Sequence, residues 1–472
     1  MGHIVVTVVG AGLAGCEAAW QASLLGADVR LIDMKPRARS PAHHIDGFAE
    51  LVCSNSLGSL SIENAKGLLK QELRALYSLI ISCADMCKVP AGNALAVDRA
   101  RFSEAVMHAL QSRRGIKIEC AELDKIPDER PCIIATGPLT TQNLLVDIAA
   151  RLGNGQLYFF DAASPIVTLR SIDESKIYRS SRYDKGEGGY INCPMSREQY
   201  EAFADALRGA ETAELHGFED TKLFEGCMPV ENLAKRGADT LRFGPLKPKG
   251  LADPATGREP YAVVQLRQDD LEGGLFNLVG FQTRLKFGEQ RRVFSMIPGL
   301  ENAEFVRYGV MHRNAYIDSP RALDCTYTLR GDNNNYCGLY FAGQITGVEG
   351  YVESVSSGLT AGIFSVLKER GWPCAGFPPE TLTGALARYI SADRHGEPAR
   401  SLDLPEGPGI VAAHMGAKRF QPMNSNFGIL PPLDEADSRK GKRERYAKYA
   451  SRSLVAIVEV AEQINKYRNC NL

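Results

Sequence analysis

The sequence lacks closely paired cysteines, although it contains 12 cysteines among 472 residues. It has neither a C-x-x-C pair nor the C-x4-C pair of disulfide reductases, so it predicts no zinc ribbon, no redox dithiol and no other metal site. Cys83 and Cys87 come closest to each other, and we interpret them as packed residues on one helix face. Every thiol is expected to be reduced, so reactivity has to be argued for each cysteine separately.

The sequence also lacks a long apolar run and an excess of basic charge. No stretch approaches the roughly 20 apolar residues that cross a bilayer, and the apolar residues 4–9 lead straight into a glycine turn rather than a signal-peptide cleavage site. We therefore expect a soluble, cytoplasmic protein with no membrane contact. With 55 Lys and Arg against 56 Asp and Glu, the net charge is -1, so binding to RNA requires local basic patches.

The first 33 residues hold a dinucleotide-binding fingerprint. A strand over residues 4–9 precedes a helix, and a second strand over residues 29–32 ends at Asp33, whose carboxylate can accept a hydrogen bond from a ribose hydroxyl. The turn between the first strand and the helix reads Gly10-Ala11-Gly12-Leu13-Ala14-Gly15. Gly10 permits the tight turn, Gly12 lets the backbone approach a pyrophosphate, and Gly15 lets the helix pack close to the sheet. The free N–H groups at the helix N-terminus then attract the phosphates.

A second glycine turn, Gly343-Gln344, follows a strand over residues 339–342, and a glycine-rich helix comes after it. Two such turns on either side of an insertion favour FAD over a bare nicotinamide. There is no second G-x-G-x-x-G, so NAD(P)H would dock without a Rossmann site of its own. The N-terminus of the later helix is expected to face the pyrimidine edge of the flavin.

The chain is too long for one core, and its patterns predict an α/β fold with two parts outside the dinucleotide-binding domain. We predict a Rossmann-type FAD-binding domain split between residues 1–154 and 301–371, with an inserted strand-rich α+β domain and a mostly helical C-terminal region. The insertion covers residues 155–300 and the helical region covers residues 372–472. Within the first part, leucine spacing predicts one helix over residues 64–82. Strands of the insertion are predicted at residues 157–160, 166–169, 261–266 and 275–279.

Two cysteines lie in turn-like surroundings. Cys53 follows a short apolar run and precedes Ser54-Asn55-Ser56, and Cys227 lies between Gly226 and Met228-Pro229. From its local sequence alone, each fits a packed small residue better than a nucleophile. Nearby glutamates, Glu225 and Glu231, disfavour a thiolate at Cys227.

Other polar groups suit general surface roles. His43-His44 is interpreted as an exposed loop pair. A run of basic residues near the C-terminus is interpreted as a solvated helix face, and it comprises Arg439, Lys440, Lys442, Arg443, Arg445 and Lys448. A second group lies beside Phe287 and Phe294 and comprises Arg284, Lys286, Arg291 and Arg292. Basic residues interleaved with aromatic ones suit RNA, so this group is either an RNA contact or a solvated face.

Taken together, the motifs resemble those of the folate- and FAD-dependent tRNA (uracil-5-)-methyltransferase family. The matching stretches cover nearly the whole chain: residues 10–15, 51–56, 89–92, 96–99, 224–229, 242–245, 279–283, 309–314, 341–344 and 422–428. The stretches around Cys227 and at residues 422–428 are the most particular to the family. Asp33 departs from the glutamate that such flavoproteins often carry.

The resemblance implies an activity. In this family, methylenetetrahydrofolate supplies a carbon to carbon 5 of a uracil, reduced FAD relays it, and NAD(P)H reduces the flavin. The substrate is tRNA, modified in its TΨC loop, and the product is 5-methyluridine. Cys227 resembles the thiol that adds to carbon 6, and Cys53 resembles its partner, a base or a second thiol, with the two roles open to exchange. No obligatory protein partner is implied.

Four alternatives remain open at this point. The same chemistry could act on a ribosomal-RNA uridine. The related flavoprotein that modifies wobble uridines with a GTPase is typically longer. The third is an FAD oxidoreductase that acts on a small molecule or a disulfide, and the absence of a C-x-x-C or C-x4-C pair speaks against a disulfide. The fourth is a flavin-bearing RNA-binding or chaperone module without catalysis.

Overall fold

The computed structural model describes most of the chain. It covers residues 3–40, 42–152, 156–162, 164–184, 190–213, 228–270, 272–309, 311–330, 336–373, 375–391, 420, 422–438 and 440–469.

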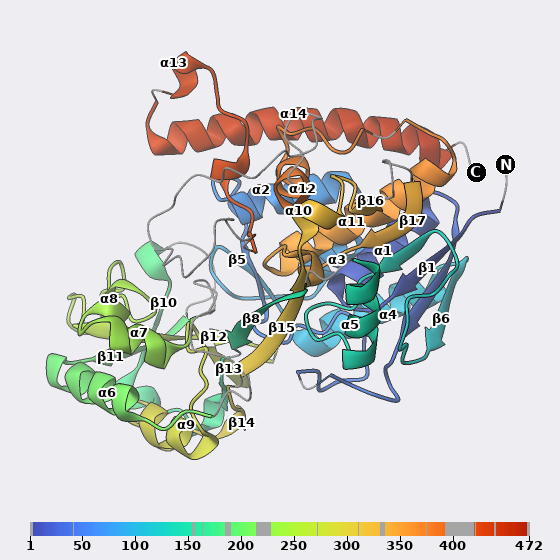
Figure 1. Cartoon of the computed structure of the whole chain (residues 1–472). Helices are drawn as coiled ribbons and strands as arrows, with labels where there is room; N and C mark the ends of the chain where they lie inside the picture. Colours follow the sequence, from blue (N-terminus) through green and yellow to red (C-terminus); the bar gives the residue numbers. More distant parts are fainter. Residues whose placement is uncertain are drawn as a thin grey trace, which may run out of the picture.

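A six-stranded sheet carries the dinucleotide fingerprint (Figure 1). Its order is β16-β17-β7-β1-β2-β6, and all neighbouring pairs are parallel except β16 with β17. The strands are β1 (Val5–Val9), β2 (Asp28–Asp33), β6 (Ile116–Cys120), β7 (Cys132–Ile134), β16 (Thr328–Arg330) and β17 (Tyr336–Phe341). Strand β17 comes from the far end of the sequence and lies beside β7. The sheet is therefore assembled from two distant segments of the chain, as predicted for the α/β fold.

Two helices that start at the same edge of this sheet pack tightly together. Helix α1 (Leu13–Leu24) follows β1, and helix α11 (Tyr351–Glu369) follows β17. A Cβ atom on Gly358 would lie 2.1 Å from the carbonyl oxygen of Ala14, and one on Gly362 would lie 2.5 Å from that of Ala18. Only glycine allows such an approach. Because the strands are parallel, the N-termini of both helices lie at the same edge of the sheet.

The single helix predicted over residues 64–82 is wrong. The structure has α2 (Ala65–Ala75) and α3 (Leu79–Met86) instead. Tyr77 between them has a φ of 61°, which no helix tolerates. Ser78 then caps α3, because its hydroxyl accepts the N–H of Ile81 and donates to the buried carboxylate of Glu17. The leucine spacing continues across a break that these polar contacts cause.

A second sheet of six strands lies apart from the first (Figure 1). Its order is β10-β11-β12-β13-β9-β14 and every neighbouring pair is antiparallel. The strands are β9 (Ile166–Thr168), β10 (Tyr178–Ser180), β11 (Tyr190–Met195), β12 (Ala262–Gln268), β13 (Leu275–Leu278) and β14 (Phe305–Arg307). Helices α6 (Arg197–Gly209), α7 (Val230–Arg236), α8 (Thr240–Phe243) and α9 (Phe287–Phe294) accompany it. These elements share a separate hydrophobic core, so the mixed α+β character predicted for this region is confirmed.

A two-stranded ribbon joins the two halves. Strand β8 (Gln156–Ala162) leaves the first half, and β15 (Met311–Ile317) returns antiparallel to it. Figure 1 shows this ribbon running between the two sheets. Smaller elements complete the first half: β3 (Ser56–Ser59), β4 (Lys88–Val89), β5 (Ala94–Val97), α4 (Arg99–Ser112), α5 (Gln142–Arg151) and α10 (Ser319–Ala322).

Helices also dominate the described part of the C-terminal region. They are α12 (Leu382–Ser391), α13 (Glu435–Ser438) and the long α14 (Lys442–Asn469), which runs beside α2 (Figure 1). The buried Glu72 on α2 fixes this arrangement, since its carboxylate accepts hydrogen bonds from the N–H groups of Leu382 and Thr383 and from the hydroxyl of Ser453. None of the helices in the described ranges is long and apolar enough to pass through a bilayer.

Candidate active site

The first glycine turn has the geometry that the fingerprint predicts. Gly10 has a φ of +99°, and a Cβ atom there would lie 2.6 Å from the carbonyl oxygen of Ala135. A Cβ atom on Gly15 would lie 1.8 Å from the carbonyl oxygen of Gly10. At Gly12, by contrast, no described atom lies within 4 Å of the Cβ position. The turn is thus packed on its protein side and open at Gly12, where a pyrophosphate needs access.

Asp33 holds this turn in place. Its carboxylate accepts the N–H of Ala11 at 2.6 Å through Oδ2 and the N–H of Lys35 at 2.9 Å through Oδ1. Each carboxylate oxygen has a second lone pair, so a ribose hydroxyl can still be accepted.

The second glycine turn lies against the first. A Cβ atom on Gly343, which has a φ of +83°, would lie 3.0 Å from the Cβ of Ala14. The N–H of Gly343 donates to the hydroxyl of Ser357 on α11 at 2.7 Å, and the Gln344 amide donates to Glu349 at 2.9 Å. Within the described ranges, no side chain caps the N-terminus of α1 at Gly12 or that of α11 at Gly350. Two uncapped helix N-termini beside adjoining glycine turns fit the phosphates and the electron-rich edge of FAD.

Cys53 lies in a loop fixed to the start of α11. The N–H groups of Cys53 and Ser54 both donate to the phenol oxygen of Tyr351, at 2.7 and 3.0 Å. Tyr351 is the first residue of α11. The loop that carries the thiol is therefore tied to the helix whose N-terminus faces the dinucleotide turns.

Three arginines hold the same loop from other elements. Arg99, on α4, donates to the carbonyl of Leu51. Arg267, on β12, donates to the side-chain oxygens of Ser54 and Asn55. Arg307, at the end of β14, donates to the carbonyl of Cys53 at 3.2 Å. Because β12 and β14 belong to the second sheet, the Cys53 loop lies where the two halves meet.

Burial shifts the ionisation of the groups around this loop. Burial raises the pKa of Tyr351, and the nearby Cys53 raises it further, so the phenol stays protonated. Burial lowers the pKa values of Arg267 and Arg307, although both guanidinium groups remain charged at neutral pH. The loop is therefore surrounded by positively charged guanidinium groups and a neutral phenol.

Cys227 lies outside the described residues, so no distance between the two candidate thiols can be given. The chain resumes at Met228, and Glu231 follows on α7. The Glu231 carboxylate is buried and accepts the hydroxyl of Thr283 at 2.8 Å and the N–H of Arg284 at 2.9 Å. These two contacts hold the side chain of Glu231 against residues 283–284.

Most of the other described cysteines are buried. Burial raises the pKa values of Cys83 and Cys132 to about 12 and also raises that of Cys87. Such thiols do not form thiolates near neutral pH, which agrees with the packing role assigned to Cys83 and Cys87.

The remaining polar groups differ from the expectations in part. His44 is exposed, as expected. His43 is partly buried and its Nδ1 lies 2.5 Å from the hydroxyl of Ser40, so the expectation of an exposed pair is correct for His44 alone. Phe294 is fully buried in the second core, whereas Phe287 has 56% of its surface exposed. Of these two rings, Phe287 is the one exposed enough to stack on an RNA base. Near the C-terminus, Lys440 pairs with Asp437 and Arg443 pairs with Glu63, while Arg439 lies outside the described residues.

Comparison with known proteins assigns the chain to a family. Residues 5–373 match the family described as Glucose inhibited division protein A. A curated methylenetetrahydrofolate--tRNA-(uracil-5-)-methyltransferase from Acetivibrio thermocellus is 53% identical over 464 residues, which are 98% of this chain and 99% of the relative. One from Lactobacillus acidophilus is 52% identical over 452 residues, 96% of this chain and 97% of the relative.

This chain belongs to the methylenetetrahydrofolate--tRNA-(uracil-5-)-methyltransferase family. Among solved structures, Aquifex aeolicus GidA has a TM-score of 0.63 at 17% identity, and the match covers 82% of this chain and 68% of that chain. That likeness supports the fold alone.

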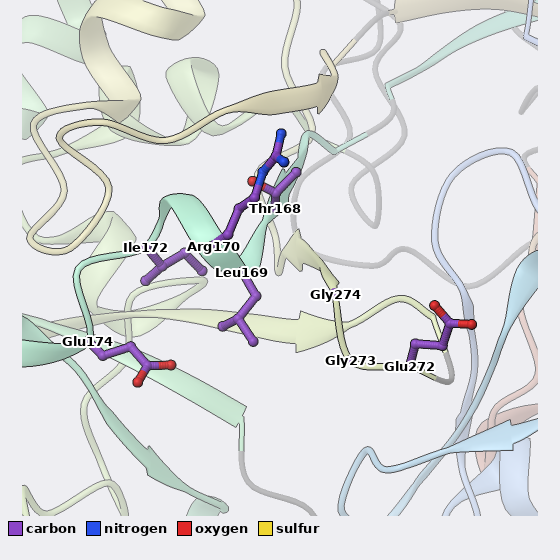
Figure 2. Close-up of a pocket in the computed structure, with 8 residues that line it drawn as sticks. All are labelled: Thr168, Leu169, Arg170, Ile172, Glu174, Glu272, Gly273 and Gly274. Carbon is purple, nitrogen blue, oxygen red and sulfur yellow. The ribbon is translucent and has the colours of Figure 1, made fainter.

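For a member of this methyltransferase family, a hollow on the second sheet is not the place of chemistry. It has a volume of about 570 Å³ and lies on the second sheet (Figure 2). Leu169 lies near its centre, with Glu174 and Glu272 at opposite sides. The lining residues are Thr168, Leu169, Arg170, Ile172, Glu174, Glu272, Gly273 and Gly274. They include no thiol and none of the residues of the two glycine turns.

Sequence reasoning missed the residues that hold the Cys53 loop in this methyltransferase. Tyr351, Arg267 and Arg307 were not singled out, and Arg99 appeared only as the last residue of the 96–99 stretch. Arg307 comes just before the family stretch at residues 309–314. Its position beside a family motif could have indicated Arg307, whereas Arg267 and Tyr351 lie beside none of these motifs.

Proposed function

We propose that this protein forms 5-methyluridine in the TΨC loop of tRNA, with methylenetetrahydrofolate as carbon donor, FAD as cofactor and NAD(P)H as reductant. The observation that supports this most strongly is the Cys53 loop, which is tied through Tyr351 to the helix that begins beside the two glycine turns. The names of the full-length relatives agree with it. A small-molecule oxidoreductase would not need a thiol fixed at this place.

The chemistry demands a nucleophile and a base. Carbon 5 of uracil is a weak nucleophile, and addition of a thiolate to carbon 6 makes it enolate-like and able to attack an electrophilic carbon. Cys227 adds to carbon 6, and Cys53 removes the proton from carbon 5 after the new bond forms. Release of the Cys227 thiolate then restores the 5,6 double bond. When bound, reduced FAD supplies the relay for the one-carbon unit and the hydride that completes the methyl group.

The chain's own residues bind and orient. The turn at residues 10–15 would hold the pyrophosphate of FAD at the N-terminus of α1, and Asp33 would accept a ribose hydroxyl. Gly343 and Gln344, next to the start of α11, would contact the flavin. The target uridine has to leave its stack to reach this place, as bases do in other enzymes that modify them.

The proposed division of the chain follows from these roles. Residues 1–154 and 301–371 bind the flavin, residues 155–300 face the RNA, and residues 372–472 support the flavin side. We place the enzyme in the cytoplasm, where its thiols stay reduced. Its partners are the RNA and the two small co-substrates, with no obligatory protein partner.

The test is a methylation assay on the purified protein with methylenetetrahydrofolate, NADPH and an unmodified tRNA transcript. We expect 5-methyluridine in the TΨC loop, located by mass spectrometry of ribonuclease fragments. A transcript in which the modified uridine is replaced by cytidine should remain unmodified. Product on ribosomal RNA but not on tRNA would refute the proposed substrate and keep the chemistry.

Variants sharpen the assay. Cys53→Ala and Cys227→Ala should each abolish product while the protein still binds RNA. Cys325→Ala, which alters a partly exposed cysteine in the turn before β16, is the matched control and should retain activity. Equal activity in all three variants would contradict the proposed roles of the two thiols.

A further inference from the structure

The loop around Cys53 has an imbalance of charge. Three guanidinium groups, those of Arg99, Arg267 and Arg307, hold it, and the facing carboxylate is that of Asp269. Asp269 is occupied by Arg99, whose Nε and Nη2 lie 2.9 and 3.2 Å from its two oxygens. Among the described residues in these contacts, one carboxylate against three cations leaves an excess of positive charge in a half-buried place.

Arg267 donates its hydrogen bonds at the loop to neutral acceptors. Its Nε donates to Asn55 at 3.0 Å, and its Nη2 donates to Ser54 and, at 3.4 Å, to Asn277. These contacts fix the guanidinium as a structural part of the loop's support.

Arg307 is different. Its Nη2 donates to the carbonyl of Cys53, but its buried Nε has no hydrogen-bond acceptor among the described residues. A guanidinium group has five N–H donors, and a buried charge without a counter-charge is costly. The guanidinium group is therefore placed to bind an anion that forms beside it.

The Cys53 thiol is the group that can supply this anion. Burial and the neighbouring Arg99 lower the pKa of Arg307, whereas Asp269, Tyr351 and Cys53 raise it. Because Arg307 also donates to the carbonyl oxygen of Cys53 itself, at 3.2 Å, the charged form of this thiol is near enough to attract the guanidinium. Because this attraction is mutual, the arginine favours the thiolate over the thiol.

We propose that Arg307 is the counter-ion of the Cys53 thiolate and acts as a positioning residue for the reaction. The titratable groups that face the loop are Arg99 on α4, Tyr190 on β11, Arg267 and Asp269 at the end of β12, Arg307 on β14 and Tyr351 on α11. Ionisation breaks the S–H bond of Cys53 and gives its proton to water. When the thiolate takes the proton of carbon 5, the S–H bond forms again and the ion pair with Arg307 ends. Arg307 then keeps its hydrogen bond to the carbonyl oxygen of Cys53.

This inference goes beyond the proposed function, because thiol ionisation can be measured without RNA or folate. The experiment follows alkylation of the flavin-loaded protein by iodoacetamide between pH 6 and 10. Cleavage after Arg39 and Lys66 gives a peptide of residues 40–66 that holds Cys53 as its single cysteine. Mass spectrometry of this peptide then gives the rate at Cys53 alone.

For Arg307→Gln, we expect alkylation to be about tenfold slower than wild type at pH 7 and equal to it at pH 10, where a thiol with an ordinary pKa of about 8.5 is ionised without help from a cation. Arg307→Lys keeps the charge and should stay close to wild type. Arg197→Gln removes an exposed arginine on α6 that pairs with Glu201 and should change nothing. An Arg307→Gln profile that matches wild type at every pH would overturn the proposal, as would a uniform loss of rate at all pH values.

A second variant keeps the test valid if Arg307→Gln does not fold. Asp269→Asn removes a negative charge near the loop, whereas Arg307→Gln removes a positive one. The thiolate of Cys53 should therefore form more readily, and its alkylation at pH 7 should become faster by about threefold to tenfold. An unchanged or slower rate at pH 7 would contradict the counter-ion role. Failure of the methylation assay would leave these outcomes unaffected, so the two proposals fail separately.

Discussion

The phenol oxygen of Tyr351 accepts the backbone N–H of Cys53 at 2.7 Å. The same oxygen accepts the N–H of Ser54 at 3.0 Å. Since Tyr351 begins α11 and α11 packs through Gly358 on α1, the place of the thiol loop depends on the place of the two dinucleotide turns. Flavin binding and thiol positioning are thus coupled through one helix.

Tyr351→Phe should separate these two functions. Removal of the phenol oxygen leaves two N–H groups without their acceptor, which costs about 1–2 kcal/mol of stability. A loop displaced by about 1 Å should lower kcat by roughly tenfold to a hundredfold, with flavin content unchanged. Tyr178→Phe, which loses a hydrogen bond to the carbonyl of Leu251 in the other half, should lower stability by a similar amount and keep kcat. Equal kcat in both variants would show that Tyr351 does not position the thiol.

Gly358→Ala should weaken flavin binding. The new methyl group would lie 2.1 Å from the carbonyl oxygen of Ala14, so α11 has to move away from α1. We expect a loss of about 1–3 kcal/mol in the free energy of unfolding and a lower ratio of flavin to protein absorbance. Gly288→Ala on α9 is the control, because no described atom lies within 4 Å of its Cβ position, and it should stabilise by about 0.5–1 kcal/mol.

The two glycine turns could be predicted from the sequence because each is a local pattern. Gly10, Gly12 and Gly15 have their roles within six consecutive residues, and Asp33 follows on the adjacent strand. The support of the Cys53 loop could not be predicted, because Arg267, Arg307 and Tyr351 reach it from three separate elements. Their meeting depends on how the second sheet docks, and no spacing in the sequence records that. Helix 64–82 failed for a related reason, since the break at Tyr77 is stabilised by the distant Glu17.

Asp33→Ala should weaken FAD binding. The carboxylate fixes the turn through the N–H groups of Ala11 and Lys35, and hydrogen bonds to a charged group contribute about 1.5–3 kcal/mol. We expect the Kd for FAD to rise by roughly tenfold to a hundredfold when apoprotein is titrated by flavin fluorescence. Asp33→Glu should bind nearly as well as wild type. Asp28→Ala, at the exposed start of the same strand, should bind as wild type does. A normal Kd in Asp33→Ala would show that the turn needs no carboxylate.

Lys70 should make stability depend on pH. Burial lowers the pKa of Lys70 from 10.5 to about 7, while its ammonium group donates to the carbonyl of Leu57 at 2.8 Å. Between these two values the unfolded chain binds more protons than the folded chain, so the free energy of unfolding rises with pH, by at most about 1.4 kcal/mol per unit. Urea denaturation at pH 7, 8 and 9 should show this rise in wild type relative to Lys70→Met. Lys66→Met, one turn earlier on α2, should keep the wild-type slope. If the free energy of unfolding changed with pH to the same extent in wild type and Lys70→Met, the lowered pKa of Lys70 would be contradicted.

The origin of the methyl carbon tests the central claim most directly. The purified enzyme is given tRNA, NADPH and methylenetetrahydrofolate that carries carbon-13 in its methylene group, and 5-methyluridine is isolated for mass spectrometry. The account predicts 5-methyluridine heavier by one mass unit with wild-type enzyme and none with Cys227→Ala. Unlabelled 5-methyluridine, or no product from a protein whose flavin NADPH reduces, would contradict it.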